Sequence, residues 1–240
     1  KLINKLYNQI PNFDQKDTSD TSLYHAYLNP YHFSDVDGRY RGMDMKIHQS
    51  SKSTQYTVFS LWDTFRAEHP LFTLTQEKRS TDMIQTLLNQ YRQGGIIPIW
   101  ELSANYTGCM IRYHAIPVIV DAYVKCIRNF DTKLALRAMV HSADQDHLGL
   151  EPYRRQGFIS SEDESESVSK TLEYAFDDWC IAVFADSLGE DSIADRFYKR
   201  SQYYKNIYNP ASTFMQPRFN GGWKNNFKPS AFVSQMEILF

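Results

Sequence analysis

The sequence predicts an all-α fold built from helical hairpins. Apolar residues recur at helical spacing in one segment after another, and glycine, proline and asparagine stand at the joints between the segments. The links are short, and the pattern contains no convincing set of strands. Short-linked helix pairs are typical of an α/α toroid or of a helical solenoid, and at this point both architectures stay open.

In the first half of the chain, the predicted helices are residues 21–29, 59–69, 80 or 81 to 92, and 111–130. The first stops before Pro30, because the residue preceding a proline avoids the helical conformation. The third stops at Gly94 and Gly95, which are suited to a helix C-terminus. Pro117 predicts a kink in the fourth helix, because proline cannot donate the helical hydrogen bond.

In the second half, the predicted helices are residues 131–143, 165–188 and 191–208. The longest carries an apolar stripe that is expected to be buried, formed by Val168, Leu172, Ala175, Phe176, Trp179 and Val183. The very short turn at Gly189 predicts that the last two helices are antiparallel neighbours. Residues 160–166 are expected to form a charged loop, and residues 210–229 an extended or irregular segment.

Length and composition exclude several classes of protein. The 240 residues suffice for one large domain, and a net charge of −2 implies no general attraction to nucleic acid or to anionic membranes. No apolar run reaches the length of a membrane span, and no signal-peptide pattern follows Lys1. Cys109, Cys126 and Cys180 lack metal or redox spacing and are expected to be buried as small hydrophobic residues.

Aromatic residues, carboxylates and arginines are concentrated in three stretches of the first half. These are Phe33-Ser-Asp-Val-Asp-Gly-Arg-Tyr-Arg-Gly-Met-Asp44, Phe59-Ser-Leu-Trp-Asp-Thr-Phe-Arg66 and Trp100-Glu-Leu-Ser-Ala-Asn-Tyr-Thr-Gly108. A sugar site needs this combination, because an aromatic ring covers the C–H face of a pyranose while charged side chains bond its hydroxyls. The stretches predict a carbohydrate groove, and a large aromatic-rich helical core is the alternative.

Trp62, Asp63 and Arg66 are the first candidate contacts. On one continuous helix Trp62 and Arg66 share a face, since residues four apart are neighbours. Asp63 is expected to accept hydrogen bonds from sugar hydroxyls, with Trp62 or Arg66 at the rim of the groove. A buried Asp–Arg pair that holds helices together is the alternative.

Trp100, Glu101 and Arg41 are the remaining candidates. Trp100 and Glu101 follow a glycine- and proline-rich approach, which is typical of a site on a loop carried by a rigid scaffold. For Glu101, a structural or helix-capping carboxylate is the alternative. Arg41 follows an Asp-Gly turn and is expected to reach the groove.

Other polar groups favour structural roles. Asp35-Val-Asp37-Gly38 begins like a calcium loop but lacks the later acidic ligands, so a turn is predicted instead. Asp177 and Asp178 point about 100° apart on a helix, so one is expected to face inward and the other to be solvated or paired. Glu173 can share a face with Asp177, one turn away. The histidines show no zinc-binding pair, and no metal site is predicted within this chain.

With a fourth stretch, Ser165-Glu-Ser-Val-Ser-Lys-Thr-Leu-Glu-Tyr-Ala-Phe-Asp-Asp-Trp179, these motifs resemble glycoside hydrolase family 92, the calcium-dependent exo-acting α-mannosidases. The likeness runs from about Leu23 to about Trp223, with the motifs in the family's order. It implies an (α/α)6 toroid, a double ring of helix pairs, present only in part. Residues 1–240 are then a partial catalytic domain, without the N-terminal β-sandwich domain and the C-terminal part of the barrel, and with an exposed apolar seam.

The resemblance also implies an activity: removal of terminal α-linked mannose by a calcium-dependent inverting mechanism. The catalytic glutamate and aspartate and most calcium ligands are expected beyond this chain, because the tail around Glu237 does not continue the family's pattern. What this chain supplies are substrate-binding residues of the barrel wall, namely Arg41, Trp62, Asp63, Arg66, Trp100 and Glu101.

Arg112 departs from the family, which has a small residue there, so the linkage preference is open. The implied partners are a mannose-containing glycan and the remainder of the same enzyme, with no nucleic acid and no membrane span; the implied location is secreted or periplasmic. One alternative is a non-catalytic helical module that binds glycan or protein, for which Tyr203-Tyr-Lys-Asn206 offers a surface. An (α/α)6 glycosidase of other specificity is another.

Overall fold

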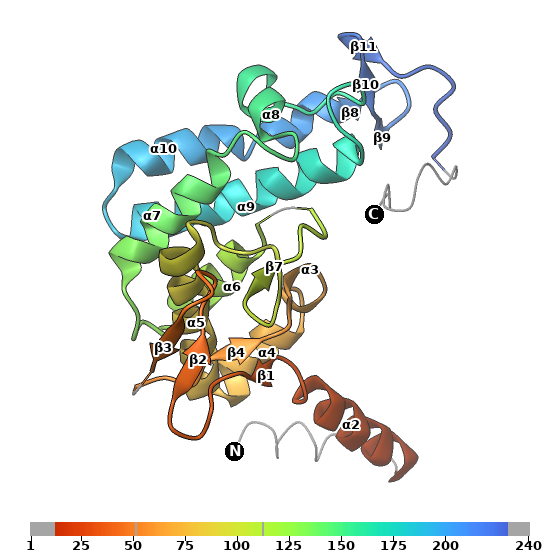
Figure 1. Cartoon of the computed structure of the whole chain (residues 1–240). Helices are drawn as coiled ribbons and strands as arrows, with labels where there is room; N and C mark the ends of the chain where they lie inside the picture. Colours follow the sequence, from red (N-terminus) through yellow and green to blue (C-terminus); the bar gives the residue numbers. More distant parts are fainter. Residues whose placement is uncertain (1–12, 51, 112, 230–240) are drawn as a thin grey trace. The chain divides into compact units, whose positions relative to one another are not determined.

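The computed structural model describes residues 13–50, 52–111 and 113–229 (Figure 1). Lys1, Arg112 and Glu237, which carried expectations above, lie outside these ranges. About half of the described residues are helical, so the helical class is confirmed in part, but short strands are present as well. The chain forms two compact units, unit 1 (Lys1–Met110 and Asp121–Thr132) and unit 2 (Ile111–Val120 and Lys133–Phe240).

Unit 1 combines helices with antiparallel strands. Its helices are α2 (Phe13–Ala26), α3 (Leu61–Thr64), α4 (Glu68–Thr75) and α5 (Glu77–Gly94). Its strands are β1 (Tyr31–His32), β2 (Arg39–Arg41), β3 (Ile47–Gln49), β4 (Tyr56–Thr57), β5 (Phe59–Ser60), β6 (Trp100–Leu102) and β7 (Asn105–Tyr106). Strand β1 pairs with β4, β2 pairs with β3, and β5-β6-β7 form a three-stranded sheet.

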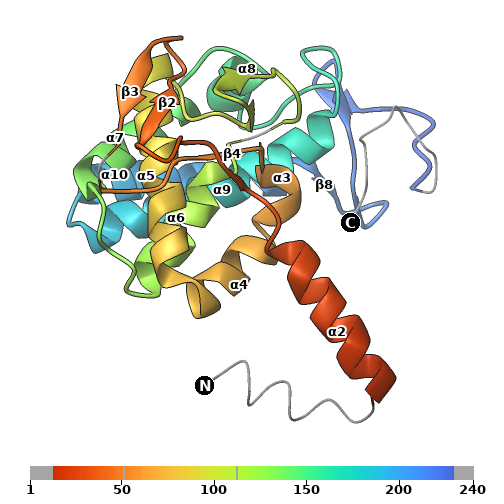
Figure 2. The same cartoon turned by 60° about the horizontal axis from the view of Figure 1, so that its bottom comes forward.

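The core of unit 1 lies against α5, which packs beside α4 (Figure 2). Its inner face carries Met83, Ile84, Leu87 and Leu88, all buried. The predicted stop is confirmed: Gly95 adopts a left-handed φ of +80° and donates its N–H to the Tyr91 carbonyl at 2.8 Å. A left-handed residue at this position satisfies a free carbonyl of the last helical turn, and glycine accepts that conformation without strain.

The prediction of one helix over residues 59–69 is wrong. Phe59 and Ser60 belong to β5, α3 is a single turn, and a new helix, α4, starts at Glu68. The reason is tertiary: Phe59 and Ser60 pair with β6, and that pairing outweighs a weak local helical preference. Trp62 and Arg66 therefore do not share the face of one continuous helix.

The prediction over residues 111–130 is also too long, because α6 covers only Ala115–Val124 and is divided between the two units. Pro117 lies in its first turn, where no intrahelical acceptor is lost, so proline itself requires no kink. Beyond the end of the helix, Cys126 has a left-handed φ of +69°. Cys126 N–H bonds to Tyr123 and Ile127 N–H to Ala122, a Schellman-type termination. Cys126 and Cys109 are exposed, contrary to expectation, whereas Cys180 is buried.

Unit 2 is mainly helical. Its helices are α7 (Thr132–Ala143, all but its first residue), α8 (Leu150–Gln156), α9 (Ser167–Ser187), α10 (Asp191–Arg200) and the 3-10 helix η1 (Tyr203–Ile207). Its strands are β8 (Tyr208–Asn209), β9 (Phe214–Met215), β10 (Arg218–Phe219) and β11 (Gly222–Trp223). After the short link at residues 188–190, α10 lies beside α9, as the short turn predicts (Figure 1).

The inner face of α9 differs from the predicted one. Val168 and Ala175 of the apolar stripe are buried, but Phe176 is 41% exposed and Trp179 48% exposed. The two rings stack with centroids 6.4 Å apart. The inward positions are instead taken by polar side chains together with Tyr174, Ile181 and Phe184; the polar ones are Glu173, Asp177 and Asp178. Each of these carboxylates has a partner inside unit 2, which orients the helix with its acidic side inward.

Candidate functional site

The three-stranded sheet of unit 1 joins two motifs that are far apart in sequence. In the antiparallel pair β5–β6, Phe59 lies opposite Glu101 and Ser60 lies opposite Trp100. Opposite residues of such a pair direct their side chains to the same face of the sheet. One face therefore collects Ser60 and Trp100, and the other receives the Glu101 carboxylate.

Ser60 connects two of the predicted sugar contacts. Its hydroxyl accepts a hydrogen bond from Trp100 Nε1 at 2.7 Å and donates one to Asp63 Oδ2. Asp63 is exposed and Trp100 is partly exposed, so a carboxylate and an indole ring border the same polar link. An open carboxylate beside an aromatic ring is the arrangement that a sugar site requires.

Glu101 lies on the inside of the fold. Its side chain is fully buried, and its carboxylate accepts hydrogen bonds from Thr57 Oγ1 at 2.9 and 3.1 Å, from Val58 N–H at 3.0 Å, and from Ala104 N–H. Burial raises the pKa of Glu101, and these hydrogen bonds oppose the rise. These contacts favour the alternative stated for Glu101, a structural carboxylate, because its oxygens accept hydrogen bonds from Thr57, Val58 and Ala104.

The other three predicted contacts occupy different settings. The Arg41 guanidinium donates a hydrogen bond to the Ser103 carbonyl, so the first motif reaches the β6–β7 turn. Trp62 is partly buried, and Arg66 is exposed, with its Cζ 4.7 Å from the centroid of the Phe65 ring. The sheet and α3 thus bring Asp63 together with Trp100, and Arg41 contacts the turn that follows β6.

The Asp-Gly turn of the first motif is confirmed. Gly38 has a φ of +82°, and its N–H bonds to the Asp35 carbonyl at 2.9 Å. The Asp37 carboxylate accepts from the Arg39 backbone N–H at 3.0 Å and from Arg39 Nε at 2.6 Å, which lowers the pKa of Asp37. The turn therefore satisfies its own carboxylate and leads the chain into β2.

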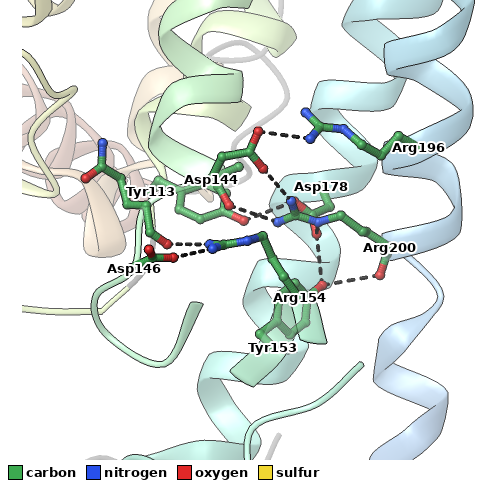
Figure 3. A network of polar contacts seen from close by, with 10 residues as sticks. Tyr113, Asp144, Asp146, Tyr153, Arg154, Asp178, Arg196 and Arg200 are labelled. Carbon is green, nitrogen blue, oxygen red and sulfur yellow. Dashed lines mark hydrogen bonds and ion pairs between the residues drawn. The ribbon is translucent and has the colours of Figure 1, made fainter. Parts of the chain in front are cut away.

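Unit 2 contains a buried polar network around Asp178 (Figure 3). The Asp178 carboxylate accepts from Arg200 Nε at 2.9 Å, from the Tyr153 hydroxyl at 2.9 Å and from the Tyr113 hydroxyl at 3.0 Å. Arg200 Nη1 also pairs with Asp144 at 3.0 Å. Burial raises the pKa of Asp178 to about 6, and Arg200 and the two hydroxyls limit the rise. This network joins α8, α9 and α10. The sequence pattern does not predict it.

A second buried cluster surrounds His114. Its Nδ1 lies 3.1 Å from Asp177 Oδ1 and its Nε2 lies 3.0 Å from Glu173 Oε2. Burial alone would lower the pKa of His114, but the two carboxylates raise it above its ordinary value. Glu173 and Asp177 do share a face, as their spacing predicts, and Asp177 and Asp178 are both fully buried, so neither is solvated.

Among the described residues, no group of three or more histidine, cysteine, aspartate or glutamate side chains is arranged to hold a metal ion. None of the described helices is both long and apolar enough to cross a membrane.

The described part of the chain thus combines helices that carry buried polar networks with an aromatic–carboxylate pair beside a small sheet. Residues 5–237 match the glycosyl hydrolase family 92 catalytic domain, and the chain belongs to this family.

Solved structures agree with this assignment. A family GH92 α-mannosidase from Bacteroides thetaiotaomicron has 41% identity and a TM-score of 0.88, over 91% of this chain and 30% of its own. A family GH92 inverting mannosidase from Bacteroides thetaiotaomicron VPI-5482 has 36% identity and a TM-score of 0.82, over 88% of this chain and 30% of its own.

A curated relative from Arthroderma benhamiae is described as an uncharacterized secreted glycosidase. It is 28% identical over an alignment of 189 residues, and the match covers 66% of this chain and 24% of the relative. The chain thus spans less than a third of the length of each of these relatives.

Proposed function

We propose that this chain is the substrate-binding helical part of an α-mannosidase that removes terminal α-linked mannose from glycans. The observation that carries the proposal is the Ser60 hydroxyl, which links the exposed Asp63 carboxylate of α3 to the indole of Trp100 on β6. Family membership and two relatives described as mannosidases, at 41% and 36% identity, support it.

In this proposal the residues have separate tasks. Asp63 accepts hydrogen bonds from sugar hydroxyls, and the face of Trp100 packs against the C–H face of the ring. Trp62 and Arg66 border the site, and Arg41 supports the turn beside it. Glu101 holds the sheet in shape. The catalytic acid and base belong to other parts of the complete enzyme, which we propose to work by an inverting single displacement.

Calcium is proposed as the cofactor of the complete enzyme, with its ligands mostly outside this chain. The described residues contain no suitable ligand cluster, so no step is assigned to the metal here. The chemistry it would supply is coordination of sugar hydroxyls by a hard cation that prefers oxygen ligands.

The test uses the complete enzyme and an aryl α-mannoside. We expect hydrolysis that stops when a chelator is added and resumes with calcium, and β-mannose as the first product seen by NMR. Glycan binding without turnover, insensitive to chelator, would instead indicate a non-catalytic binding module. Turnover of another α-glycoside in preference to the mannoside would indicate a glycosidase of other specificity.

We propose the remainder of the same enzyme as the partner that completes an (α/α)6 barrel, and a secreted or periplasmic location where glycans are met. The half-exposed ring of Trp179 on α9, next to Phe176, supports such packing, because a stacked aromatic pair favours an apolar partner. In the complete enzyme, the fluorescence of Trp179 is obtained as the difference between the parent and the Trp179→Phe variant. We expect acrylamide to quench this fluorescence only weakly. Strong quenching would argue against a cover over this face.

A further inference from the structure

We propose that Ser60 is the positioning residue of the sugar site, which fixes the Asp63 carboxylate and the Trp100 indole relative to each other. The inference deepens the proposed function and rests on it for the roles of Asp63 and Trp100. It concerns a residue that neither the motif chemistry nor the helical pattern singled out.

The register of the sheet provides the first argument. Ser60 and Trp100 are directly opposite in the antiparallel pair β5–β6, and Trp100 Nε1 lies 2.7 Å from Ser60 Oγ. An indole N–H can only donate a hydrogen bond, so the serine oxygen is the acceptor. The edge of the indole ring is therefore fixed to β5 by a side chain as well as by the backbone.

The direction of the second hydrogen bond follows from the same chemistry. An ionised carboxylate can only accept, so the single hydroxyl proton of Ser60 points to Asp63 Oδ2. The order Trp100 N–H to Ser60 O–H to Asp63 carboxylate has no alternative assignment. Hydrogen bonds in such a chain polarise one another, so a change at either end is felt at the other.

The usual reason for a serine at this position is absent. Ser60 is the N-cap residue of α3, where a hydroxyl normally accepts a hydrogen bond from a backbone N–H of the first turn. Ser60 makes no such side-chain capping bond. Its hydroxyl instead accepts from Trp100 and donates to Asp63, so its described hydrogen bonds orient these two side chains and do not cap the helix.

The link leaves Asp63 able to bind a ligand. In the described part of the chain its polar contact uses Oδ2 and the residue is exposed, so we expect Oδ1 to accept a sugar hydroxyl. On the opposite face of the same strand pair, the buried Glu101 carboxylate bonds to Thr57 and Val58. Hydrogen bonds on both faces thus hold the strand pair in place, and Ser60 connects this pair to the Asp63 side chain.

The experiment compares Ser60→Ala, Ser60→Thr, Asp63→Ala and the double variant Ser60→Ala/Asp63→Ala in the complete enzyme. Because loss of orientation weakens sugar contacts, we expect Ser60→Ala to lower kcat/KM about 10-fold and Ser60→Thr, which keeps the hydroxyl, to stay within about 2-fold of the parent. In the Asp63→Ala background, Ser60→Ala should add little, since residues that act through each other are not additive. Ser22→Ala, at an exposed serine of α2, is the matched control.

A second readout does not depend on activity. The enzyme is labelled with fluorotryptophan, and the Trp100 fluorine resonance is assigned by its loss in Trp100→Phe. We expect this resonance to move in Ser60→Ala and also, through the serine, in Asp63→Ala, but not in Ser22→Ala. An unmoved resonance in both variants, or additive losses of kcat/KM, would overturn the positioning role. An enzyme that moves the resonance but hydrolyses no α-mannoside would contradict only the proposed function.

Discussion

Asp63 follows Trp62 and Asp178 precedes Trp179 in the sequence, yet the environments of these two carboxylates are opposite. In unit 1, Asp63 is exposed and has one serine as its partner. In unit 2, Asp178 is fully buried and accepts hydrogen bonds from an arginine and two tyrosines. The comparison teaches that an acidic–aromatic dipeptide does not define a site; the partners that the fold brings to it do.

The largest effect is expected at Asp178. Asp178→Ala removes one of the two carboxylates described beside the buried Arg200 and should destabilise unit 2 by about 3–5 kcal/mol, because Arg200 is left with Asp144 and the Tyr113 hydroxyl loses its acceptor. The midpoint of chemical denaturation measures this loss. Asp186→Ala, at an exposed position of the same helix, is the control and should change the midpoint by less than about 1 kcal/mol. Equal effects of the two variants would contradict the conclusion that the buried Asp178 stabilises unit 2 more than the exposed Asp186 does.

Glu101 should behave like Asp178 and not like Asp63. Glu101→Ala leaves the Thr57 hydroxyl and the Val58 and Ala104 N–H groups without their acceptor, at a cost of about 1–3 kcal/mol for each buried group. We therefore expect a lower unfolding midpoint and a smaller soluble yield. A stable Glu101→Ala enzyme whose only defect is in kcat/KM would restore the sugar-contact role predicted from sequence.

Asp63→Ala should lower activity and leave stability unchanged, the reverse of Glu101→Ala. Loss of a charged hydrogen bond to the sugar, roughly 3 kcal/mol in a closed site, is expected to lower kcat/KM at least ~10²-fold while the unfolding midpoint stays unchanged. Steady-state kinetics with an aryl α-mannoside and a denaturation curve on the same preparation test both parts. Near-parent kinetics would remove Asp63 from the site.

Two buried histidines extend the comparison to pH. Burial, helped by Arg79, lowers the pKa of His69 in unit 1 to about 4 from an ordinary value of 6.5. Between these two pKa values, His69 is protonated in the unfolded chain but neutral in the folded one. The free energy of unfolding therefore falls as the pH drops through this range, by up to about 1.4 kcal/mol per pH unit.

His114 in unit 2 has the opposite sign. Its folded pKa is raised by Asp177 and Glu173, so its contribution is fully present below pH 6.5 and is lost as the pH rises through the raised value. Unfolding midpoints measured from pH 4 to pH 8 should therefore depend less on acid in His69→Gln and less on alkali in His114→Gln. The same pH profile in both variants would contradict this opposition.

Much of the helical content could be predicted from the sequence. The amphipathic pattern and Gly95 predict α5, and α7 and α9 lie close to their predicted bounds. The helix predicted over residues 191–208 is too long, because α10 ends at Arg200 and the 3-10 helix η1 follows it. The helix predicted over residues 59–69 is wrong because β5 pairs with β6, a strand some forty residues away. A local sequence pattern carries no information about such a distant pairing. The buried apolar stripe predicted for α9 is wrong in part because Glu173, Asp177 and Asp178 face inward instead. Their hydrogen-bond partners come from other elements, which the pattern of α9 alone does not reveal.

The sugar-contact roles of the candidate residues stay predictions, and the structure shows where their side chains lie. The motifs named Asp63 and Trp100, and the structure brings these two together, but it buries Glu101 and adds Ser60 as their link. Serine at a helix start is expected to cap, so its pattern carries no signal of this other use.

The sequence by itself determined the family, the helical class and the residue types of a sugar site, because these depend on composition, spacing and local preference. Only the tertiary structure decided which carboxylate is open and which is buried. That outcome depends on the hydrogen-bond donors that distant segments bring to each carboxylate, and a carboxylate stays inside a protein only where such donors replace water.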